Sequence, residues 1–440
     1  MRWLTLTSLL AICIGGGVLG RIQHDETSAQ FGRLRRQAQK WKNGVVGSRT
    51  IYYWFNNNID PTSQQLFMAA TQEWAKDTCL KFEYGNSVGS VQVGYYSRGG
   101  CYHQTHRTGS WLNTGCHTLG QITHELGHAL GLGHTHNRHD RDNYINVNWY
   151  NVDAGFYDIA RMNPGMKLEV YRNQFKPMTT AENDNYDVPY DYGSIMHYGV
   201  PRRNPAMETN DPNYYRTIGS GLISFADYLM VNKHYKCDEI CDKKTSAQCE
   251  RGGFPNPNDC NTCVCPGGYG GPLCKDQPME CNEAKTLDAT EQDQQVQINA
   301  YNQIGDRLHY FKCTTWIKAP EGKRIIVEIT DMNSYSDKLG CTAAGIEIKA
   351  QEDQRLTGYR FCSNNDRGRS MESKSNLVPI IAYALDGTVY ATLRYRYKTK
   401  DAMEMVDQVL YYFNQTNTQT MLMNSWKMFF RNQSSLTHLR

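Results

Sequence analysis

The sequence predicts a multidomain protein in which a mixed α and β domain precedes a small cysteine-rich module and an all-β domain. Three observations favour this fold class. The chain has 440 residues, which is too long for one ordinary domain. Strand-like and helix-like patterns share the chain up to about Cys237. Cys, Gly and Pro then dominate as far as Cys281, and strand-like patterns follow.

The first domain begins with the aromatic and β-branched run "RTIYYWF" at 49–55, which predicts a strand. Asp60 and Pro61 follow as a helix cap and first turn. A helix running towards Cys79 is indicated by apolar residues at helical spacing: Leu66, Phe67, Ala70 and Trp74. The run "SVQVGYY" at 90–96 predicts another strand.

The module at 238–275 is too short to bury an adequate apolar core, so disulfides must stabilise it. From Cys281 to 397 we expect a β-sandwich, with strands in "RIIVEITDM", "AGIEIKAQ" and "TVYATLRYRYK". In the last run, apolar and polar residues alternate, as on a strand with one buried face. The apolar set is Val389, Ala391, Leu393, Tyr395 and Tyr397.

Residues 1–20 indicate a secretory signal peptide, with Arg2 before an apolar run that ends in small residues. A membrane anchor is the alternative, but the run is short for a span of ~20 residues. Residues 21–36 are polar and end in a basic cluster, which predicts a short propeptide cleaved after Arg36. The tail at 398–440 is polar, with predicted glycosylation at Asn414 and Asn432.

Cysteine content and charge indicate a secreted protein. Loss of the signal removes Cys13 and leaves fourteen of the fifteen cysteines, which predicts seven disulfides in an oxidising compartment. The formal net charge is +3, so a nucleic-acid partner is not expected. No later run is long and apolar enough to predict a membrane span. The oligomeric state stays open.

The segment "THELGHALGLGH" at 123–134 predicts a metal site. His124 and His128 are four apart and share a helix face, and Glu125 lies beside the first of them. His134 reaches the same ion only if the helix ends and the chain turns back, which glycines at 131 and 133 allow. Three imidazoles would hold one zinc ion, with a fourth position for water.

The sequence "HELGHALGLGHTHNRHDRD", followed by "SIMHY", resembles the astacin family of metzincin proteases. The resemblance implies an α+β catalytic domain at 37–237, with a twisted sheet, an active-site helix and Gly131 in its turn. It places Met196 beneath the zinc and makes Tyr198 a catalytic residue. The next two segments resemble an EGF-like module at 238–275 and a CUB domain at 281–397.

The same resemblance implies a pairing for the cysteines, which spacing alone does not decide. The implied pairs are Cys79–Cys237, Cys101–Cys116, Cys241–Cys260, Cys249–Cys263, Cys265–Cys274, Cys281–Cys313 and Cys341–Cys362.

The implied activity is endopeptidic hydrolysis of extracellular proteins, with one zinc per chain. Zinc activates water, Glu125 takes its proton, and Tyr198 donates a hydrogen bond to the developing oxyanion. Partners are protein or peptide substrates, with extracellular matrix as a further candidate. One alternative is an adhesion protein that acts through its EGF-like and CUB modules, and another is a structural zinc protein.

Three features depart from the family pattern. Thr135 stands where astacins carry a glutamate that binds the mature amino terminus, here Gln37, which could cyclise. The propeptide lacks the usual zinc-binding aspartate, and Asp25 is the available substitute. Ala344 replaces an acidic residue of calcium-binding CUB domains, so no calcium is expected there.

Polar residues around the motif receive structural interpretations. An ion-pair network is expected from Arg138, Asp140, Arg141 and Asp142. Five other histidines are expected on the surface or around the metal ligands without binding the ion: His103, His106, His136, His139 and His197.

Overall fold

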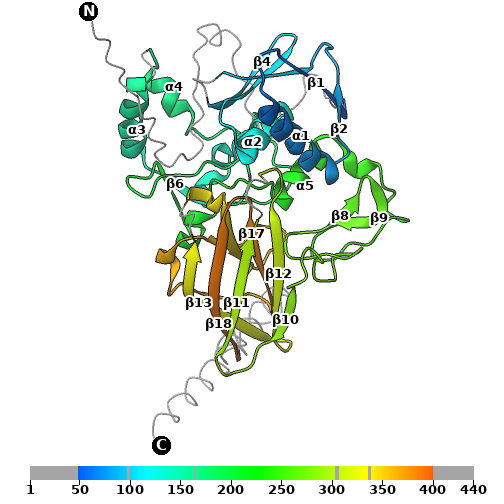
Figure 1. The fold of residues 1–440 in the computed structure, drawn as a ribbon, viewed down its shortest axis with the longest axis vertical. Helices are drawn as coiled ribbons and strands as arrows, with labels where there is room; N and C mark the ends of the chain where they lie inside the picture. The colour runs from blue at the N-terminus through cyan, green and yellow to red at the C-terminus, as the bar shows by residue number, and fades with distance from the viewer. Residues whose placement is uncertain (1–47, 97–99, 163–164, 303–306, 335–337, 400–440) are drawn as a thin grey trace, which may run out of the picture.

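The computed structural model describes residues 48–96, 100–162, 165–302, 307–334 and 338–399 (Figure 1). Several predictions concern residues outside these ranges: the signal peptide, the propeptide with Arg36, Gln37 and Asp25, and the glycosylation sites Asn414 and Asn432. They stay predictions.

The amino-terminal domain contains a five-stranded sheet in the order β2-β1-β3-β5-β4. All pairs are parallel except β4–β5, so β4 forms an antiparallel edge. The strands are β1 (Thr50–Phe55), β2 (Lys81–Tyr84), β3 (Val91–Gly94), β4 (Cys101–His106) and β5 (Gly109–Thr114). The predicted strands at 49–55 and 90–96 are thus confirmed.

Helix α1 (Pro61–Lys76) confirms the predicted cap and helix. The Asp60 carboxylate accepts a hydrogen bond from the Ser63 backbone N–H at 2.9 Å, which satisfies one unpaired donor of the first turn. The indole of Trp74 is fully buried and donates to the carbonyl of Thr123 at 3.1 Å. This bond fixes α1 against helix α2 (Leu119–Ala129), which carries the predicted metal motif.

The rest of this domain is built from shorter elements: α3 (Trp149–Met162), α4 (Leu168–Asn173), α5 (Phe225–His234), β6 (Ile145–Val147) and β7 (Met207–Thr209). One apolar cluster packs α1 and α2 against the sheet, and Met196 belongs to it. A second, tyrosine-rich cluster contains Tyr198. The turn between these two residues therefore joins the two cores.

Residues after Cys237 form a small hairpin, β8 (Phe254–Asn256) and β9 (Asp259–Val264), beside the amino-terminal domain (Figure 1). The side-chain amide nitrogen of Asn258 lies within hydrogen-bond distance of the carbonyls of Ala75, Lys76 and Thr78 at the end of α1. The hairpin module is thus fastened to that helix.

The carboxy-terminal domain is a β-sandwich of two sheets, β10-β12-β17-β14-β15 and β11-β18-β13-β16. The strands are β10 (Lys285–Asp288), β11 (Gln294–Tyr301), β12 (Phe311–Lys318), β13 (Lys323–Ser334), β14 (Ala344–Ile348), β15 (Tyr359–Phe361), β16 (Ser370–Glu372), β17 (Leu377–Ala384) and β18 (Thr388–Thr399). Both sheets contribute to one apolar core, which confirms the all-β prediction. Strand β18 ends at Thr399, because Lys398 and Thr399 pair with β13, so the predicted tail boundary at 398 is two residues too early.

In the described residues, disulfides join fourteen cysteines in seven pairs, and these are the pairs that the family resemblance implied. Two pairs lie in the amino-terminal domain, where Cys79–Cys237 joins its distant ends and Cys101–Cys116 links β4 to the segment after β5. Three pairs lie in the hairpin module and two lie in the sandwich. Within the described part of the chain, none of the helices is both long enough and apolar enough to cross a bilayer.

Candidate metal centre and active site

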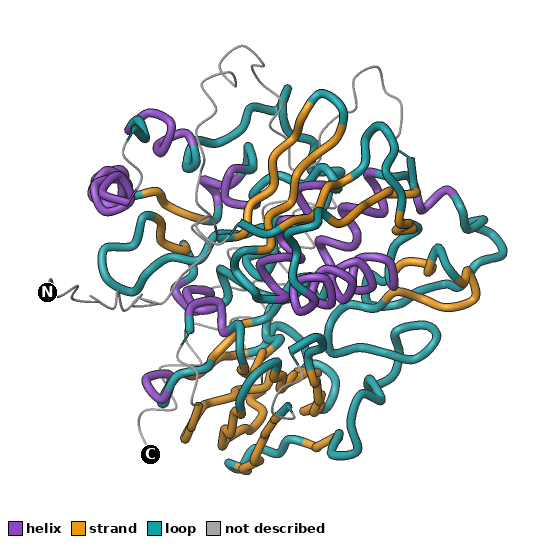
Figure 2. Tube along the Cα trace, turned by 45° about the horizontal axis from the view of Figure 1, so that its top comes forward, coloured by secondary structure: helices purple, strands orange, loops and turns teal. Residues whose placement is uncertain are grey.

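Helix α2 carries His124 and His128 four residues apart, one turn along the same face. The helix is fixed by its apolar side, on which Leu119, Ile122 and Leu126 are buried against α1 and the sheet. His124 and Glu125 are also buried, whereas His128 is half-buried. Figure 2 shows the purple helices lying beside the orange strands of the sheet.

The helix ends in a turn that brings His134 back to the first two histidines. Gly131 adopts φ +94°, which a residue with a side chain avoids. Its N–H bonds to the carbonyl of His128 and the N–H of Leu132 bonds to that of Gly127, both at 3.0 Å, the pattern of a Schellman cap. The prediction is confirmed for Gly131, whereas Gly133 is not among the residues with positive φ.

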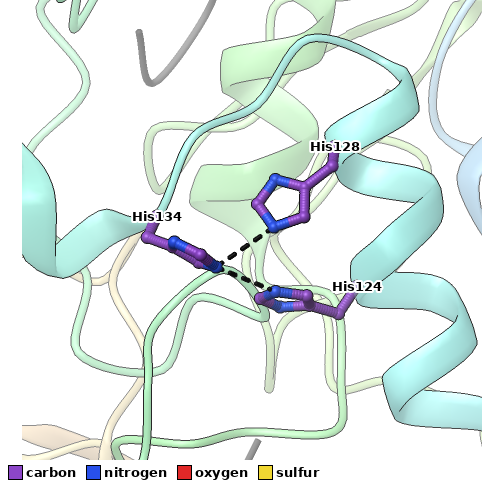
Figure 3. Close-up of side chains that lie close together, drawn as sticks. All are labelled: His124, His128 and His134. Atoms are coloured by element: carbon purple, nitrogen blue, oxygen red, sulfur yellow. Dashed lines mark hydrogen bonds between the residues drawn. The ribbon is translucent and has the colours of Figure 1, made fainter. Parts of the chain in front are cut away.

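The Nε2 atoms of the three histidines meet at one point (Figure 3). His134 Nε2 lies 3.3 Å from that of His124 and 3.1 Å from that of His128. Nδ1 of His124 lies 2.7 Å from the carbonyl oxygen of Ile195, and Nδ1 of His128 lies 2.8 Å from that of Leu132. A carbonyl only accepts, so each Nδ1 carries the proton and each Nε2 presents a lone pair.

This geometry fits a divalent metal ion. His134 Nε2 has at most one hydrogen, so it cannot donate to both neighbouring lone pairs, and a shared cation removes the conflict. Two nitrogens bound tetrahedrally to zinc lie about 3.3 Å apart, close to the observed separations. The other cluster with metal-binding atoms in the described residues contains Cys281 and Cys313, which are joined in a disulfide.

Burial also favours neutral imidazoles at this site. It lowers the pKa of His124 to about 3, with the neighbouring His128 acting in the same direction. Burial is also the largest cause that lowers the pKa values of His128 and His134. Burial raises the pKa of Glu125 to about 8, although a backbone hydrogen bond from His103 opposes this. A cation held by the histidines would favour the charged carboxylate.

The turn at 191–198 lies beneath the histidines and orients them. The Ile195 carbonyl accepts the Nδ1–H of His124, and the Met196 carbonyl accepts the backbone N–H of Thr135 at 3.0 Å. Met196 is fully buried, and a Cβ at Gly127 would lie 2.6 Å from its sulfur. Met196 therefore packs directly under helix α2.

Tyr198 lies beside the third histidine, with its ring centroid 4.2 Å from that of His134. Burial, together with the charge of Glu125, raises the pKa of its phenol above the usual range. The hydroxyl is therefore protonated at neutral pH and able to donate a hydrogen bond. A cleft of about 740 Å³ opens at the site, with His103, His128 and His134 in its lining.

Comparisons with known proteins agree with this geometry. Residues 33–236 match the model of the astacin peptidase family. Zinc metalloproteinase nas-31 of Caenorhabditis elegans is 36% identical over 389 residues, which cover 84% of this chain and 60% of that protein. Zinc metalloproteinase nas-17 of the same nematode is 31% identical over 378 residues, covering 83% and 81%. This chain belongs to the astacin family.

The chain spans only 60% of the length of nas-31 and 56% of the length of zinc metalloproteinase nas-32, a further relative from Caenorhabditis elegans. Among solved structures, it is similar to high choriolytic enzyme 1, a hatching enzyme zinc-protease from Oryzias latipes. That similarity has 25% sequence identity and a TM-score of 0.35, and it covers 49% of this chain and 98% of that one.

Thr135, which replaces the usual glutamate of astacins, is buried in a chain of hydrogen bonds. Its hydroxyl donates to Ser194 Oγ at 2.8 Å, and Ser194 donates to the Asp227 carboxylate at 2.6 Å. Asp227 also accepts from the backbone N–H of Ile195 at 2.8 Å. A buried carboxylate of α5 thus fixes the turn beneath the metal site in this astacin domain.

Sequence reasoning missed Asp227 and Ser194 as parts of the site. Ser224 and Asp227 form a capping box at the start of α5, and this spacing is visible in the sequence. That signal predicts a helix start. It gives no indication that the same carboxylate reaches the turn at 194–195, because the contact joins segments more than thirty residues apart.

The other histidines are only partly on the surface. His106 is exposed, whereas His136 and His197 are buried, and the ring centroid of His136 lies 5.1 Å from that of His134, so His136 takes the second of the two expected positions, around the metal ligands. His103 lies on edge strand β4, with its ring centroid 6.4 Å from that of His128. The surrounding core buries His136 and His197, and the spacing of histidines in the sequence does not reveal this. The Nδ1 atom of His139 forms a hydrogen bond with the side-chain oxygen of Asn183.

The expected ion pairs are present next to the motif. Arg138 contacts Asp140 at 2.7 Å and Arg141 contacts Asp142 at 2.6 Å, and both guanidinium groups are buried. Arg141 also donates to the carbonyls of His136 and Phe175. These residues therefore anchor the chain after His134.

Acid should destabilise this domain partly through His197. Burial lowers its pKa to about 4, whereas an unfolded histidine titrates near 6.5. The unfolded chain therefore binds this proton first, so the stabilisation is complete above pH 6.5 and is lost as the pH falls towards 4. Denaturant titrations measure the free energy of unfolding at about pH 7.5 and at about pH 4.5. We expect the loss of this free energy between the two pH values to be about 2–3 kcal/mol smaller in His197→Gln than in the wild type.

The exposed His106 provides the matched control, because His106→Gln should keep the wild-type pH dependence. If His197→Gln and the wild type lose equal unfolding free energy over this range, the neutral, buried assignment of His197 is wrong.

Proposed function

We propose that this protein is a secreted zinc endopeptidase that hydrolyses internal peptide bonds of extracellular proteins. The observation that carries the proposal is the convergence of three imidazole Nε2 atoms next to the buried carboxylate of Glu125. Membership of the astacin family and the names of the relatives, zinc metalloproteinases, support it.

In the proposed mechanism, His124, His128 and His134 would hold one zinc ion, and the ion would supply Lewis acidity for the scissile carbonyl and for a water molecule. Glu125 is the general base that accepts the proton of this water as it attacks the carbonyl carbon. The same carboxyl then delivers the proton to the leaving amine. Tyr198 donates a hydrogen bond to the oxygen that becomes negative in the transition state.

The remaining modules fit the same proposal. We assign residues 238–275 to an EGF-like module, residues 281–397 to a CUB domain, and Arg36 to the processing site. Seven disulfides support an oxidising, extracellular location. Protein substrates are recognised in the cleft beside His103 and His134, and matrix proteins are candidate partners of the modules.

The test is to incubate the processed, purified chain with a complex protein mixture and to sequence the new termini. We expect cleavage at internal positions that stops with a zinc chelator and returns when zinc is restored. Products formed equally with and without chelator would overturn the proposal. Zinc binding without any cleavage would favour the structural zinc protein instead.

A further inference from the structure

We propose that Thr357 of the β-sandwich is a positioning residue for the metal centre, so that the carboxy-terminal domain completes the active site of the protease domain. The inference rests on the proposed function. It starts from a contact between two segments that are 166 residues apart in the sequence.

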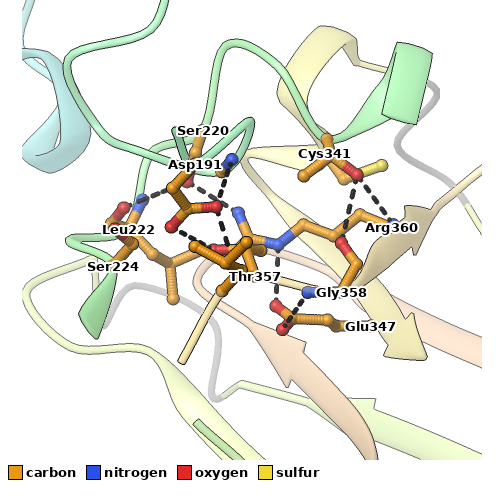
Figure 4. Close-up of polar contacts among 12 residues, drawn as sticks. Asp191, Ser220, Leu222, Ser224, Cys341, Glu347, Thr357, Gly358 and Arg360 are labelled. Carbon is orange, nitrogen blue, oxygen red and sulfur yellow. Dashed lines mark hydrogen bonds and ion pairs between the residues drawn. The ribbon is translucent and has the colours of Figure 1, made fainter. Parts of the chain in front are cut away.

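Thr357 binds the buried carboxylate of Asp191 in two ways (Figure 4). Its backbone N–H donates to Oδ1 at 3.1 Å, and its hydroxyl donates to Oδ2 at 3.0 Å. Asp191 is 2% exposed. A buried carboxylate needs such donors, because water cannot supply them.

Asp191 passes this restraint to the turn beneath the histidines. Its Oδ1 also accepts from the backbone N–H of Gly193 at 3.0 Å. Two residues further on, the Ile195 carbonyl accepts the Nδ1–H of His124. The sandwich is therefore linked to a predicted metal ligand through one carboxylate and one short turn.

No space separates the two segments at this point. A Cβ on Gly193 would lie 2.3–2.4 Å from the side-chain atoms of Thr357, so the threonine packs directly on the glycine backbone. A side chain at position 193 would push the domains apart or displace the turn. The close approach makes the position of the turn depend on the position of the sandwich.

A buried polar interface fixes the sandwich segment that carries Thr357. Arg360 pairs with Glu347 at 3.0 Å and donates to Ser220 Oγ of the protease domain at 2.6 Å. The backbone N–H of Arg360 donates to Thr217 Oγ1 at 3.0 Å. Arg360 and Glu347 are 4% and 6% exposed, so the interface excludes water around the pair.

A second ion pair also crosses the interface, between Arg216 of the protease domain and Asp366 of the sandwich, at 2.9 Å. Tyr359 donates its hydroxyl hydrogen to Asp211 at 2.8 Å. The hairpin module contacts the sandwich as well, because Trp316 donates to the Gly268 carbonyl at 2.8 Å. These contacts hold the three domains in one arrangement rather than as separate units on flexible linkers.

The experiment compares Thr357→Val with Thr357→Ser in the full-length, processed protein. Valine keeps the shape and the backbone N–H but removes the hydroxyl donor, whereas serine keeps the donor. We expect Thr357→Val to lower kcat on a peptide substrate about 10-fold with KM changed by less than about twofold, and serine to restore most of kcat. The Co²⁺-substituted Thr357→Val protein should show a shifted visible absorption spectrum.

Two controls separate positioning from general stability. Thr330→Val removes a hydroxyl that donates to Thr392 inside the sandwich, away from the interface. Ser220→Ala removes a partner of Arg360 in the same interface but leaves Asp191 paired. Both should keep the wild-type kcat and spectrum, even where thermal stability falls. Should Thr357→Val not fold, Thr357→Ala provides the same comparison with less bulk.

The proposal is overturned if Thr357→Val, or its alanine substitute, lowers stability but keeps the wild-type kcat and Co²⁺ spectrum. It is also overturned if Ser220→Ala reproduces the loss of kcat. An inactive wild type would refute the proposed function instead, and the Co²⁺ spectrum would still test whether Thr357 positions the metal site.

Discussion

Glu125→Gln should lower kcat about 10³-fold while the protein keeps its zinc. Glutamine has nearly the same shape as glutamate, but its amide cannot accept and return a proton. The side chain is buried beside the three histidines without being one of the converging ligands, so metal binding should persist. Steady-state kinetics on a peptide substrate and metal analysis of the same sample measure the two quantities.

A matched control for this variant is Glu208→Gln on β7, where the carboxylate is exposed on the same domain. It should keep wild-type kcat and zinc content. Near-normal turnover by Glu125→Gln would remove this residue from the mechanism. Loss of zinc from Glu125→Gln would instead show that the carboxylate helps to hold the ion.

His134→Ala should abolish stable zinc binding and, with it, proteolysis. The variant leaves two imidazoles on helix α2, and a third protein ligand from the returning chain is lost. We expect the zinc-to-protein ratio after dialysis to fall from about one to below about one tenth. Unfolding should no longer depend on added zinc, because a ligand stabilises the native state only when its concentration is comparable to or above its Kd.

The comparison for His134→Ala is His106→Ala, which removes an exposed histidine from the lining of the same cleft. This control should keep one zinc per chain. Stoichiometric zinc in His134→Ala would contradict the assignment of the three ligands.

The contact between the sandwich and the turn beneath the metal site changes how mutations in this astacin should be interpreted. Two carboxylates bind this turn or lie in it: Asp191, which accepts from Thr357 of the sandwich, and Asp227, which belongs to α5. A substitution in the sandwich at Thr357 is therefore expected to alter catalysis, whereas one at Thr330 is not. Thr330 and Thr357 are both far from the histidines in the sequence, so sequence distance alone does not predict which substitution alters catalysis.

Much of the site could be predicted because its signals are local. The spacing of His124 and His128 follows from the helix period, and the return of His134 needs a glycine such as Gly131, so twelve consecutive letters specify most of the centre. The helix cap at Asp60 and the alternation in β18 are equally local. Each depends on backbone geometry over a few residues, and the local sequence determines that geometry.

The contacts that decide the rest join distant segments. The sequence alone predicted three ligands, a base and the fold class, but did not show that Ile195 orients His124, that Thr135 and Ser194 lead to Asp227, or that Thr357 reaches Asp191. The burial of His136 and His197 was also invisible in their spacing. Hydrogen bonds and burial depend on which surfaces meet after folding, and only the tertiary structure brings these segments together.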